Sequence, residues 1–219
     1  MLLYYMDVSE LDLYKMQAFV SKERIEKANQ YFHQKDKFLS IGAEILLNHV
    51  LSKIGIINPI FDTDKYAKPY LKNYPNVYFN LSHSEKYVAC AVSDSPIGVD
   101  IEYINDIDLT VAKHYFYGSE YEYILNNNNQ KKAFFELWVL KESYMKMTGL
   151  GFRLALDEFC IEINDEIKLI HNDENTGKFG LWNVCEGDYM LGLCSKNKVN
   201  EPVLINYSDL VLNLNFDSN

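Results

Sequence analysis

Segments with helical patterns precede segments with strand patterns twice along this chain, and that order limits the folds open to it. Apolar residues at helical spacing, with a serine cap before the first helix, predict two helices, and short apolar runs bounded by turn residues predict strands after them. The elements expected in the first stretch are a strand at the N-terminus, helices at about 21–33 and 36–54, and strands at 77–80, 87–93 and 97–102.

The same order then repeats after a loop-rich segment and a short turn. We expect an α+β protein of two halves of similar size, residues 1–104 and 105–219, without a clean linker between them. Ligand sites often lie in clefts between such halves, so we expect the active site there. The tail beyond Leu212 is expected to fray. The loop-rich segment is 58–76, and the later elements are helices at about 109–116, 120–125 and 130–148 and strands at 158–163, 180–184, 189–194 and 203–207.

The composition of the 219 residues is that of an ordinary globular protein, with 48% hydrophobic and 24% charged residues. The formal net charge of −10 argues against general nucleic-acid binding. The N-terminal apolar run is too short for a signal peptide or a membrane span, so we expect a cytoplasmic protein that does not associate with membranes. The cysteines lack zinc spacing and are expected to be buried thiols in a reduced compartment; they are Cys90, Cys160, Cys185 and Cys194.

The segment Ile97-Gly-Val-Asp-Ile-Glu102 alternates apolar residues with glycine and carboxylates. Neighbouring side chains of a strand face opposite sides, so Asp100 and Glu102 would share a face with about 6–7 Å between their backbone positions. Two unpaired carboxylates repel each other, and a hard cation such as Mg²⁺ that binds both would relieve the repulsion. An ordinary solvated strand face explains the alternation equally well.

The predicted helix at 130–148 contains a second group of polar residues. Trp138, Glu142 and Lys146 follow one another at a spacing of four, so they share one helix face. A glutamate with a lysine four residues later is also a common surface pair, and that pair alone does not define a site. Lys141 is close in sequence, but its side chain should point about 100° away around the helix.

The segment Asn80-Leu-Ser-His-Ser84 follows a predicted strand and carries an amide, two hydroxyls and an imidazole. Such groups suit an oxyanion or phosphate site, and they suit a plain turn as well. The stretch 21–37 is locally basic, with five Lys or Arg against three Asp or Glu. That excess fits either a solvated helix face or a local site for an anion.

In their order along the chain, these segments resemble the motifs of the 4′-phosphopantetheinyl transferases, specifically the larger two-half, surfactin-synthetase-activating type. The resemblance implies two pseudo-symmetric α+β halves with coenzyme A bound in the cleft between them. It also implies transfer of the phosphopantetheine arm of coenzyme A to a serine of an apo acyl or peptidyl carrier protein, with release of adenosine 3′,5′-bisphosphate. The matching segments are 21–46, Tyr66-Ala-Lys-Pro-Tyr-Leu71, Asn80–Ser84, Ile97–Glu102 and Trp138–Gly151.

The resemblance further implies roles for individual residues. Asp100, Glu102 and Glu142 would be Mg²⁺ ligands, and the ion would neutralise charge that grows on the leaving phosphate. Glu142 would also act as the general base for the carrier serine, and Lys146 would stabilise or protonate the leaving group. The implied contacts to the co-substrate coenzyme A are Ser82 and His83 at its phosphates, Lys68 at its nucleotide end and Lys27 near its 3′-phosphate.

Two positions depart from the family pattern. Ala67 precedes Lys-Pro where the family usually has glycine, although the turn needs glycine only where φ is positive. Leu39 stands where family members commonly carry an arginine that binds the 3′-phosphate. Lys35 or Lys37 would have to replace that contact.

Other functions stay open at this point. The chain has no G-x-x-x-x-G-K-[ST] and no G-x-G-x-x-G motif, so a nucleotide hydrolase of those types has little support. A non-catalytic module that binds coenzyme A or a carrier protein is the alternative. The resemblance implies a monomer, and the carrier could serve fatty-acid, polyketide or nonribosomal peptide synthesis. Carrier proteins are typically acidic, so we expect this acidic chain to recognise one through apolar contacts in the aromatic segment 115–123, with Phe116 as the test position.

Overall fold

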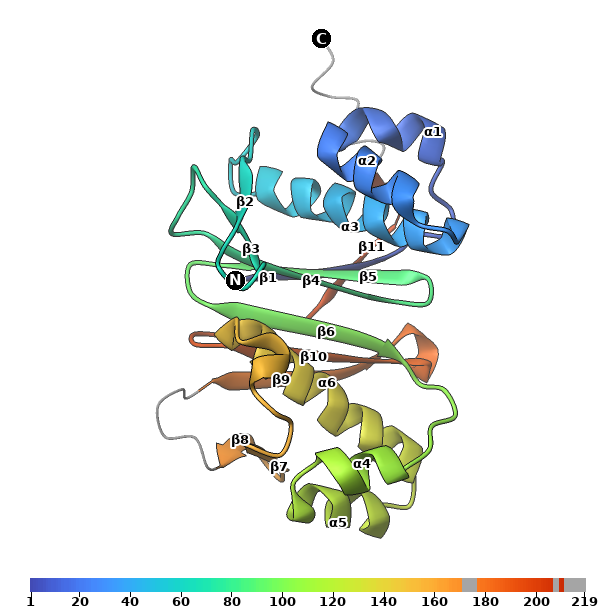
Figure 1. The fold of residues 1–219 in the computed structure, drawn as a ribbon, viewed down its shortest axis with the longest axis vertical. Coiled ribbons are helices and arrows are strands. Elements are labelled where there is room, and N and C mark those ends of the chain that lie inside the picture. Colours follow the sequence, from blue (N-terminus) through green and yellow to red (C-terminus); the bar gives the residue numbers. More distant parts are fainter. Residues whose placement is uncertain (171–176, 207–208, 211–219) are drawn as a thin grey trace.

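The fold has four stacked layers, a helix, two β-sheets and a second helix, as Figure 1 shows from α3 above the sheets to α6 below them. The computed structural model describes residues 1–170, 177–206 and 209–210. Its helices are α1 (Leu13–Met16), α2 (Lys22–Gln30), α3 (Gln34–Ser52), α4 (Thr110–Tyr115), α5 (Gly118–Asn126) and α6 (Gln130–Thr148), with short 3₁₀ helices at Gln17–Phe19, Gly151–Arg153 and Cys185–Gly187.

The strands form two larger sheets and two small hairpins. The first sheet has the order β11-β1-β5-β4, with β1 parallel to β11 and the other pairs antiparallel. The second has the antiparallel order β6-β10-β9, and the hairpins are β2–β3 and β7–β8. The strands are β1 (Leu2–Asp7), β2 (Phe61–Thr63), β3 (Pro69–Leu71), β4 (Tyr78–Ser84), β5 (Tyr87–Ser93), β6 (Ile97–Tyr103), β7 (Cys160–Ile163), β8 (Ile167–Ile170), β9 (Lys178–Val184), β10 (Tyr189–Ser195) and β11 (Val203–Ile205).

Strand β5 shows how the layers are held together. Its side chains alternate between two cores: Val88 and Cys90 pack with residues of α3, whereas Ala89 and Ala91 pack with residues of β6 and β10. All four side chains are fully buried. A strand that is covered on both faces needs apolar residues at every position, which explains the unbroken apolar run in this part of the sequence.

Helix α6 approaches the second sheet closely because two glycines face it. A Cβ at Gly98 of β6 would lie 2.0 Å from the carbonyl oxygen of Ser143, and one at Gly192 of β10 would lie 2.6 Å from that of Val139. No side chain larger than hydrogen fits between these backbones. The two glycines therefore fix the distance between α6 and the strand that carries the predicted carboxylate pair.

The expected α+β class is confirmed, and α6 begins and ends at the predicted residues. Three expectations were wrong: β2 and β3 lie inside the segment expected to be loop, β8 was not expected, and β4 continues to Ser84. The division at 104/105 stays a prediction, and two strand pairings cross it, β6 with β10 and β1 with β11. The tail beyond Leu212 lies outside the described residues.

All four cysteines are free thiols, and Cys185 is the one that is half-buried rather than buried. No helix in the described ranges is long and apolar enough to cross a membrane.

Candidate active site

The edge strands of the two sheets, β4 and β6, lie beside each other and are joined by side chains of β4. Three polar side chains of β4 reach β6, at every second position of the strand. Because this spacing matches the alternation of a strand, all three lie on one face of β4. The contacts are Val99 N–H to Asn80 Oδ1 at 2.9 Å, Ser82 Oγ to Asp100 Oδ1 at 2.7 Å and Ser84 Oγ to Glu102 Oε2 at 2.8 Å.

The segment Asn80–Ser84 was expected to follow a strand, and it is instead the second half of β4. The correction matters for the site, because alternation places His83 on the opposite face from Ser82 and Ser84. Sequence reasoning did not assign a role to Ser84. The signal that could have found it is its spacing of two from Ser82 in a strand.

Lys146 joins α6 to both edge strands. Its ammonium donates to Asp100 Oδ1 at 2.6 Å, to Ser82 Oγ at 3.0 Å and to the carbonyl oxygen of Val99 at 3.3 Å. Asp100 is only 2% exposed, so this cation compensates most of the charge of a buried carboxylate. The structure therefore brings two predicted site residues, Asp100 and Lys146, into direct contact.

Three carboxylates crowd this region, and the pKa values of the two glutamates respond. Burial, and then the charge of Asp100, raise the pKa of Glu102 to about 7. Burial and Asp100 also raise the pKa of Glu142, and the Lys146 ammonium opposes that shift. The predicted strand pair and the predicted helix glutamate thus sense one another electrostatically, as residues of one site should.

The same carboxylates offer the donor chemistry that a magnesium ion needs. Asp100 Oδ2 is buried and has no hydrogen-bond partner within the described parts of the chain, which leaves an oxygen available to a cation. Carboxylate oxygens are the ligands Mg²⁺ prefers, and a divalent ion would relieve the repulsion that raises the two pKa values. Residues 1–170, 177–206 and 209–210 contain no ready-made group of three close metal-ligating side chains. The residue types fit a magnesium ion, and the side chains would have to converge on it.

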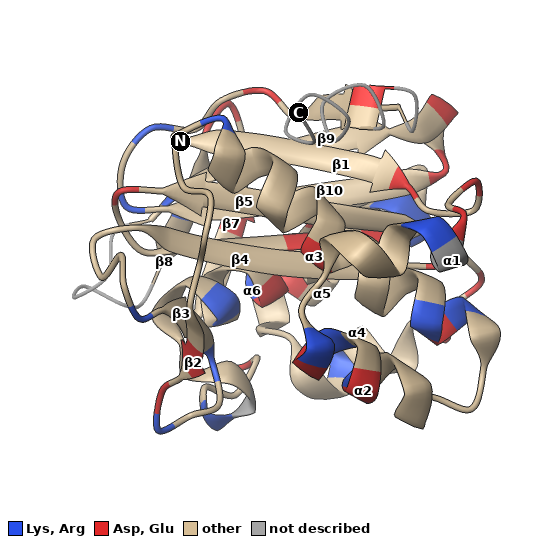
Figure 2. Cartoon of the chain, turned by 90° about the horizontal axis from the view of Figure 1, so that it is seen from above, with Lys and Arg blue, Asp and Glu red and all other residues tan. Residues whose placement is uncertain are grey.

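The residues implied to contact coenzyme A are spread around this cluster. Ser82 is bound to Asp100 and Lys146, and His83 keeps an exposed surface on β4. Partial burial of the imidazole and the nearby Lys146 ammonium lower the pKa of His83. Lys27 is exposed on α2, where Figure 2 shows basic and acidic positions side by side.

The hairpin β2–β3 contains the departure at Ala67. This residue has φ = 64°, the left-handed conformation that glycine adopts without strain. Asp64 holds the turn, because its Oδ1 accepts hydrogen bonds from the backbone N–H groups of Tyr66 and Lys68 at 2.8 and 2.9 Å. The turn therefore forms with alanine, and the Lys68 side chain reaches the end of α6.

The second departure, Leu39, lies in the hydrophobic core. It is 3% exposed and packs in the core between α3 and the first sheet. Of the two lysines expected to replace an arginine there, Lys35 forms an ion pair with Glu85 at 2.5 Å. Lys37 is half-buried on α3.

Lys141, which belongs to the same sequence motif as Glu142, is fully buried and turned away from the site, as its helical position predicts. Its ammonium lies 2.6 Å from Glu120 Oε1 and 2.8 Å from the carbonyl oxygen of Phe159. Glu120 also accepts the backbone N–H groups of Tyr117 and Ile161. The pair links α5, α6 and β7, a structural role that the sequence did not reveal because the partners are 21 residues apart.

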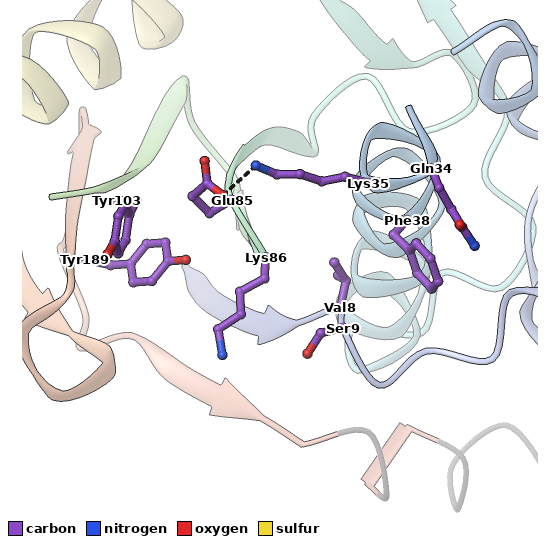
Figure 3. Close-up of a pocket in the computed structure, with 9 residues that line it drawn as sticks. All are labelled: Val8, Ser9, Gln34, Lys35, Phe38, Glu85, Lys86, Tyr103 and Tyr189. Atoms are coloured by element: carbon purple, nitrogen blue, oxygen red, sulfur yellow. Dashed lines mark hydrogen bonds and ion pairs between the residues drawn. The ribbon is translucent and has the colours of Figure 1, made fainter. Parts of the chain in front are cut away.

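Neither of two cavities in the described parts of the chain is lined by the carboxylate cluster. One of about 640 Å³ lies beside the β4–β5 turn, and Figure 3 shows the Lys35–Glu85 pair and two tyrosines, Tyr103 and Tyr189, around it. The other, of about 1000 Å³, lies between α3 and the β2–β3 hairpin. We therefore locate the candidate site by its chemistry, at the meeting of β4, β6 and α6.

An α+β chain with a buried carboxylate–lysine cluster between two sheet edges fits an enzyme that handles a charged phosphate group. A sequence model of the 4′-phosphopantetheinyl transferase superfamily matches residues 96–194. The chain is 33% identical over 169 residues to the 4′-phosphopantetheinyl transferase Sfp of Bacillus subtilis, a match that covers 74% of this chain and 75% of that protein.

A second relative agrees. The chain is 36% identical over 157 residues to the 4′-phosphopantetheinyl transferase gsp of Aneurinibacillus migulanus, which covers 69% of this chain and 65% of that protein. Among solved structures, holo-[acyl-carrier-protein] synthase from Neisseria meningitidis aligns with a TM-score of 0.41 and 14% identity, over 47% of this chain and 98% of that one. The chain belongs to the 4′-phosphopantetheinyl transferase family, and it is a transferase of the 4′-phosphopantetheinyl group.

Proposed function

We propose that this enzyme transfers the phosphopantetheine arm of coenzyme A to a serine of an apo acyl or peptidyl carrier protein and releases adenosine 3′,5′-bisphosphate. The observation that carries the proposal is the contact of Lys146 with Asp100 and Ser82, beside two glutamates with raised pKa values. That cluster places a positive ammonium beside negative carboxylates, and phosphate transfer requires both kinds of charge. Its three segments are those in which the chain resembles the family.

In the proposed reaction, the oxygen of the carrier serine attacks the β-phosphorus of coenzyme A. The new bond joins serine to the β-phosphate, and the bond between that phosphorus and the oxygen bridging to the α-phosphate breaks. Glu142 takes the serine proton, directly or through water, and its raised pKa makes the carboxylate a better base. Lys146 stabilises the departing phosphate oxygen or donates a proton to it.

Asp100, Glu102 and Glu142 would hold a magnesium ion. When bound, that ion supplies positive charge that neutralises the diphosphate and the leaving group. Ser82 and His83 would contact the phosphates of coenzyme A, and Lys27 its 3′-phosphate. A second contact for the 3′-phosphate has to come from a residue other than Leu39, which is buried in the core.

The carrier protein needs an exposed apolar surface to bind. Phe116, the expected test position, is wrong for this purpose because it is buried. Phe116 is only 5% exposed and stacks on Phe134 and Trp138 at ring-centroid distances of 5.5 and 6.2 Å. Its neighbour Tyr115 is 59% exposed. We propose Tyr115 as the contact, and Tyr115→Ala should raise the KM for the carrier while the KM for coenzyme A stays unchanged.

The decisive experiment is incubation with coenzyme A, Mg²⁺ and an apo carrier protein, followed by intact mass measurement of the carrier. A mass gain of one phosphopantetheine that disappears with EDTA supports the proposal. No gain with fatty-acid, polyketide and peptide-synthetase carriers would contradict it. Coenzyme A binding without any gain would favour the alternative, a non-catalytic binding module.

Glu142→Gln tests the base assignment in the same assay. Turnover should fall by roughly 100-fold or more, whereas coenzyme A affinity should stay within a few-fold, because the amide keeps the shape of the side chain. Glu136→Gln on the same helix is the matched control. Equal losses of turnover and coenzyme A binding would contradict a role as base.

Three further proposals concern the organisation of the protein. Residues 1–104 would form the half that binds coenzyme A, and residues 105–219 the half that carries the catalytic helix, with pseudo-symmetry between them. We propose a cytoplasmic enzyme that works as a monomer. Sedimentation at micromolar concentration with and without coenzyme A tests the oligomeric state.

A further inference from the structure

Lys68 connects the β2–β3 hairpin to the end of the catalytic helix. Its ammonium donates hydrogen bonds to the carbonyl oxygen of Lys146 and, at 3.3 Å, to that of Met147. These carbonyls belong to the last turn of α6, which ends at Thr148. Two distant parts of the chain are therefore held together by one side chain.

The last carbonyls of a helix have no partner within the helix, and a cation at that end is favoured by the helix dipole. In α6 the C-cap Gly149 has φ = 76°, and its N–H returns to the carbonyl of Met145. The carbonyls of the next two residues accept the hydrogen bonds that Lys68 donates. The lysine thus completes the C-terminal cap of the helix from outside.

The turn around Asp64 orients Lys68 toward the end of α6. Asp64 accepts the N–H groups of Tyr66 and Lys68, and its own N–H donates to the carbonyl of Lys68 at 3.0 Å. The aliphatic stem passes close to α6, since a Cβ at Gly149 would lie 3.4 Å from Lys68 Cδ. Burial of the ammonium lowers the pKa of Lys68, as expected for a side chain enclosed between two elements.

The held turn is the one that carries Lys146, whose side chain contacts Asp100 and Ser82. The Lys146 carbonyl and the Lys146 ammonium are thus fixed at once, one by the hairpin and the other by the two sheet edges. A small shift of the backbone at this residue would move the ammonium from its contacts. Errors of about 1 Å in such positions can cost up to roughly 100-fold in rate.

We propose that Lys68 is a positioning residue that fixes the last turn of α6, and with it Lys146, rather than a residue that binds the nucleotide end of coenzyme A. The catalytic part of this inference rests on the proposed function, because it assumes that Lys146 acts in the transfer. The structural part, that Lys68 fixes the last turn of α6, does not depend on the proposed function. Two of the three ammonium N–H groups are already given to helix carbonyls, so a nucleotide would have to compete for them.

Hydrogen–deuterium exchange tests the structural part. Lys68→Met removes the donors and keeps most of the stem, and Lys72→Met, a 63% exposed lysine from the same segment, is the matched control. The backbone amides of residues 145–149 should exchange several-fold faster in Lys68→Met, and at the wild-type rate in Lys72→Met. Wild-type protection in Lys68→Met would overturn the proposal, whatever the kinetics show.

Steady-state kinetics test the catalytic part. Lys68→Met should lower kcat by about 10- to 100-fold and change the KM for coenzyme A by less than about threefold. Lys68→Arg, which can still donate to both carbonyls, should recover part of the loss. A KM raised tenfold or more with an unchanged kcat would overturn the proposal in favour of nucleotide binding. Failure of the wild-type enzyme to modify any carrier would contradict the proposed function alone, since the exchange result does not depend on transfer.

Discussion

The ammonium of Lys146 lies 2.6 Å from Asp100 Oδ1 and joins helix α6 to strand β6 at the centre of the candidate site. The aspartate is almost fully buried, and its second oxygen has no partner among the residues described. One carboxylate thus neutralises a lysine with one oxygen and offers the other to a cation. Lys146 and a magnesium ion would share the charge of the same group.

Lys146→Met should therefore strengthen Mg²⁺ binding while it abolishes turnover. Removing a positive charge a few Å from the ion should raise the Mg²⁺ affinity by about tenfold, because like charges at that distance repel by roughly 1–4 kcal/mol. Turnover should fall by about 100-fold or more. Calorimetric titration with Mg²⁺ measures the first effect, with Lys132→Met on the same helix as control. Unchanged or weaker binding would show that Lys146 serves chiefly to hold Asp100 in place.

The raised pKa of Glu102 predicts a pH dependence of stability in the metal-free protein. Between pH 4.5 and about 7 the folded protein holds a proton that the unfolded chain has released. The stability contributed by this proton is therefore fully present below pH 4.5 and is lost as pH rises through about 7, a loss of about 3 kcal/mol. Glu102→Gln, which mimics the protonated form, should be more stable than wild type by that amount at pH 8.

Urea unfolding in EDTA at pH 5 and pH 8 measures this difference. At pH 5 the advantage of Glu102→Gln should shrink to about 1 kcal/mol or less. The control is Glu162→Gln, an exposed glutamate of β7, which should give no such gain at pH 8. A Glu102→Gln variant no more stable than wild type at pH 8 is incompatible with the burial and repulsion described.

The buried pair of Lys141 and Glu120 predicts a large loss of stability when it is broken. Both side chains are at most 1% exposed, so Lys141→Met leaves the Glu120 carboxylate without its cation in the core. The expected loss is about 3–5 kcal/mol in the free energy of unfolding. Lys141→Met combined with Glu120→Gln should recover part of it, because no charge is then left unpaired.

Denaturant unfolding of the two single variants and the double variant checks the prediction as a cycle. A loss below about 1 kcal/mol for Lys141→Met would mean that the pair is not enclosed as the structure shows. Kinetics on variants that still fold should give a kcat within a few-fold of wild type. A specific loss of kcat in a stable variant would instead point to a catalytic part for Lys141.

The left-handed conformation of Ala67 predicts that Ala67→Gly stabilises the protein. A Cβ in this conformation costs roughly 1–2 kcal/mol, and the greater freedom of glycine in the unfolded chain offsets part of the gain. We expect a net gain of about 0.5–1 kcal/mol, measured by urea unfolding. Ala112→Gly, inside α4, is the control and should destabilise. A loss of stability in Ala67→Gly would show that the φ of 64° is not strained.

Local patterns in the sequence predict much of the fold. Helix α6 follows its helical periodicity from Gln130 to Thr148, and Ser21 caps α2 by accepting the N–H of Arg24. Such signals are local, since caps and periodicity depend on residues a few positions apart. The strands β2, β3 and β8 were missed because each is only three or four residues long.

Spacing along the chain predicts which residues carry the chemistry. Asp100 and Glu102 share a face because strands alternate, and Glu142 and Lys146 share a face because helices repeat. The order of these motifs determined the family. Both results come from spacing along the chain, which no tertiary contact alters.

Only the tertiary structure decided what those residues touch. Gly98 and Gly192 let α6 settle against the second sheet, and the apposed edges of β4 and β6 place Ser82 on Asp100. The same packing buries Lys141 with Glu120 and draws Lys68 to the end of α6. These partners are far apart in sequence and come into contact only when the layers pack. Local sequence patterns therefore do not predict such contacts.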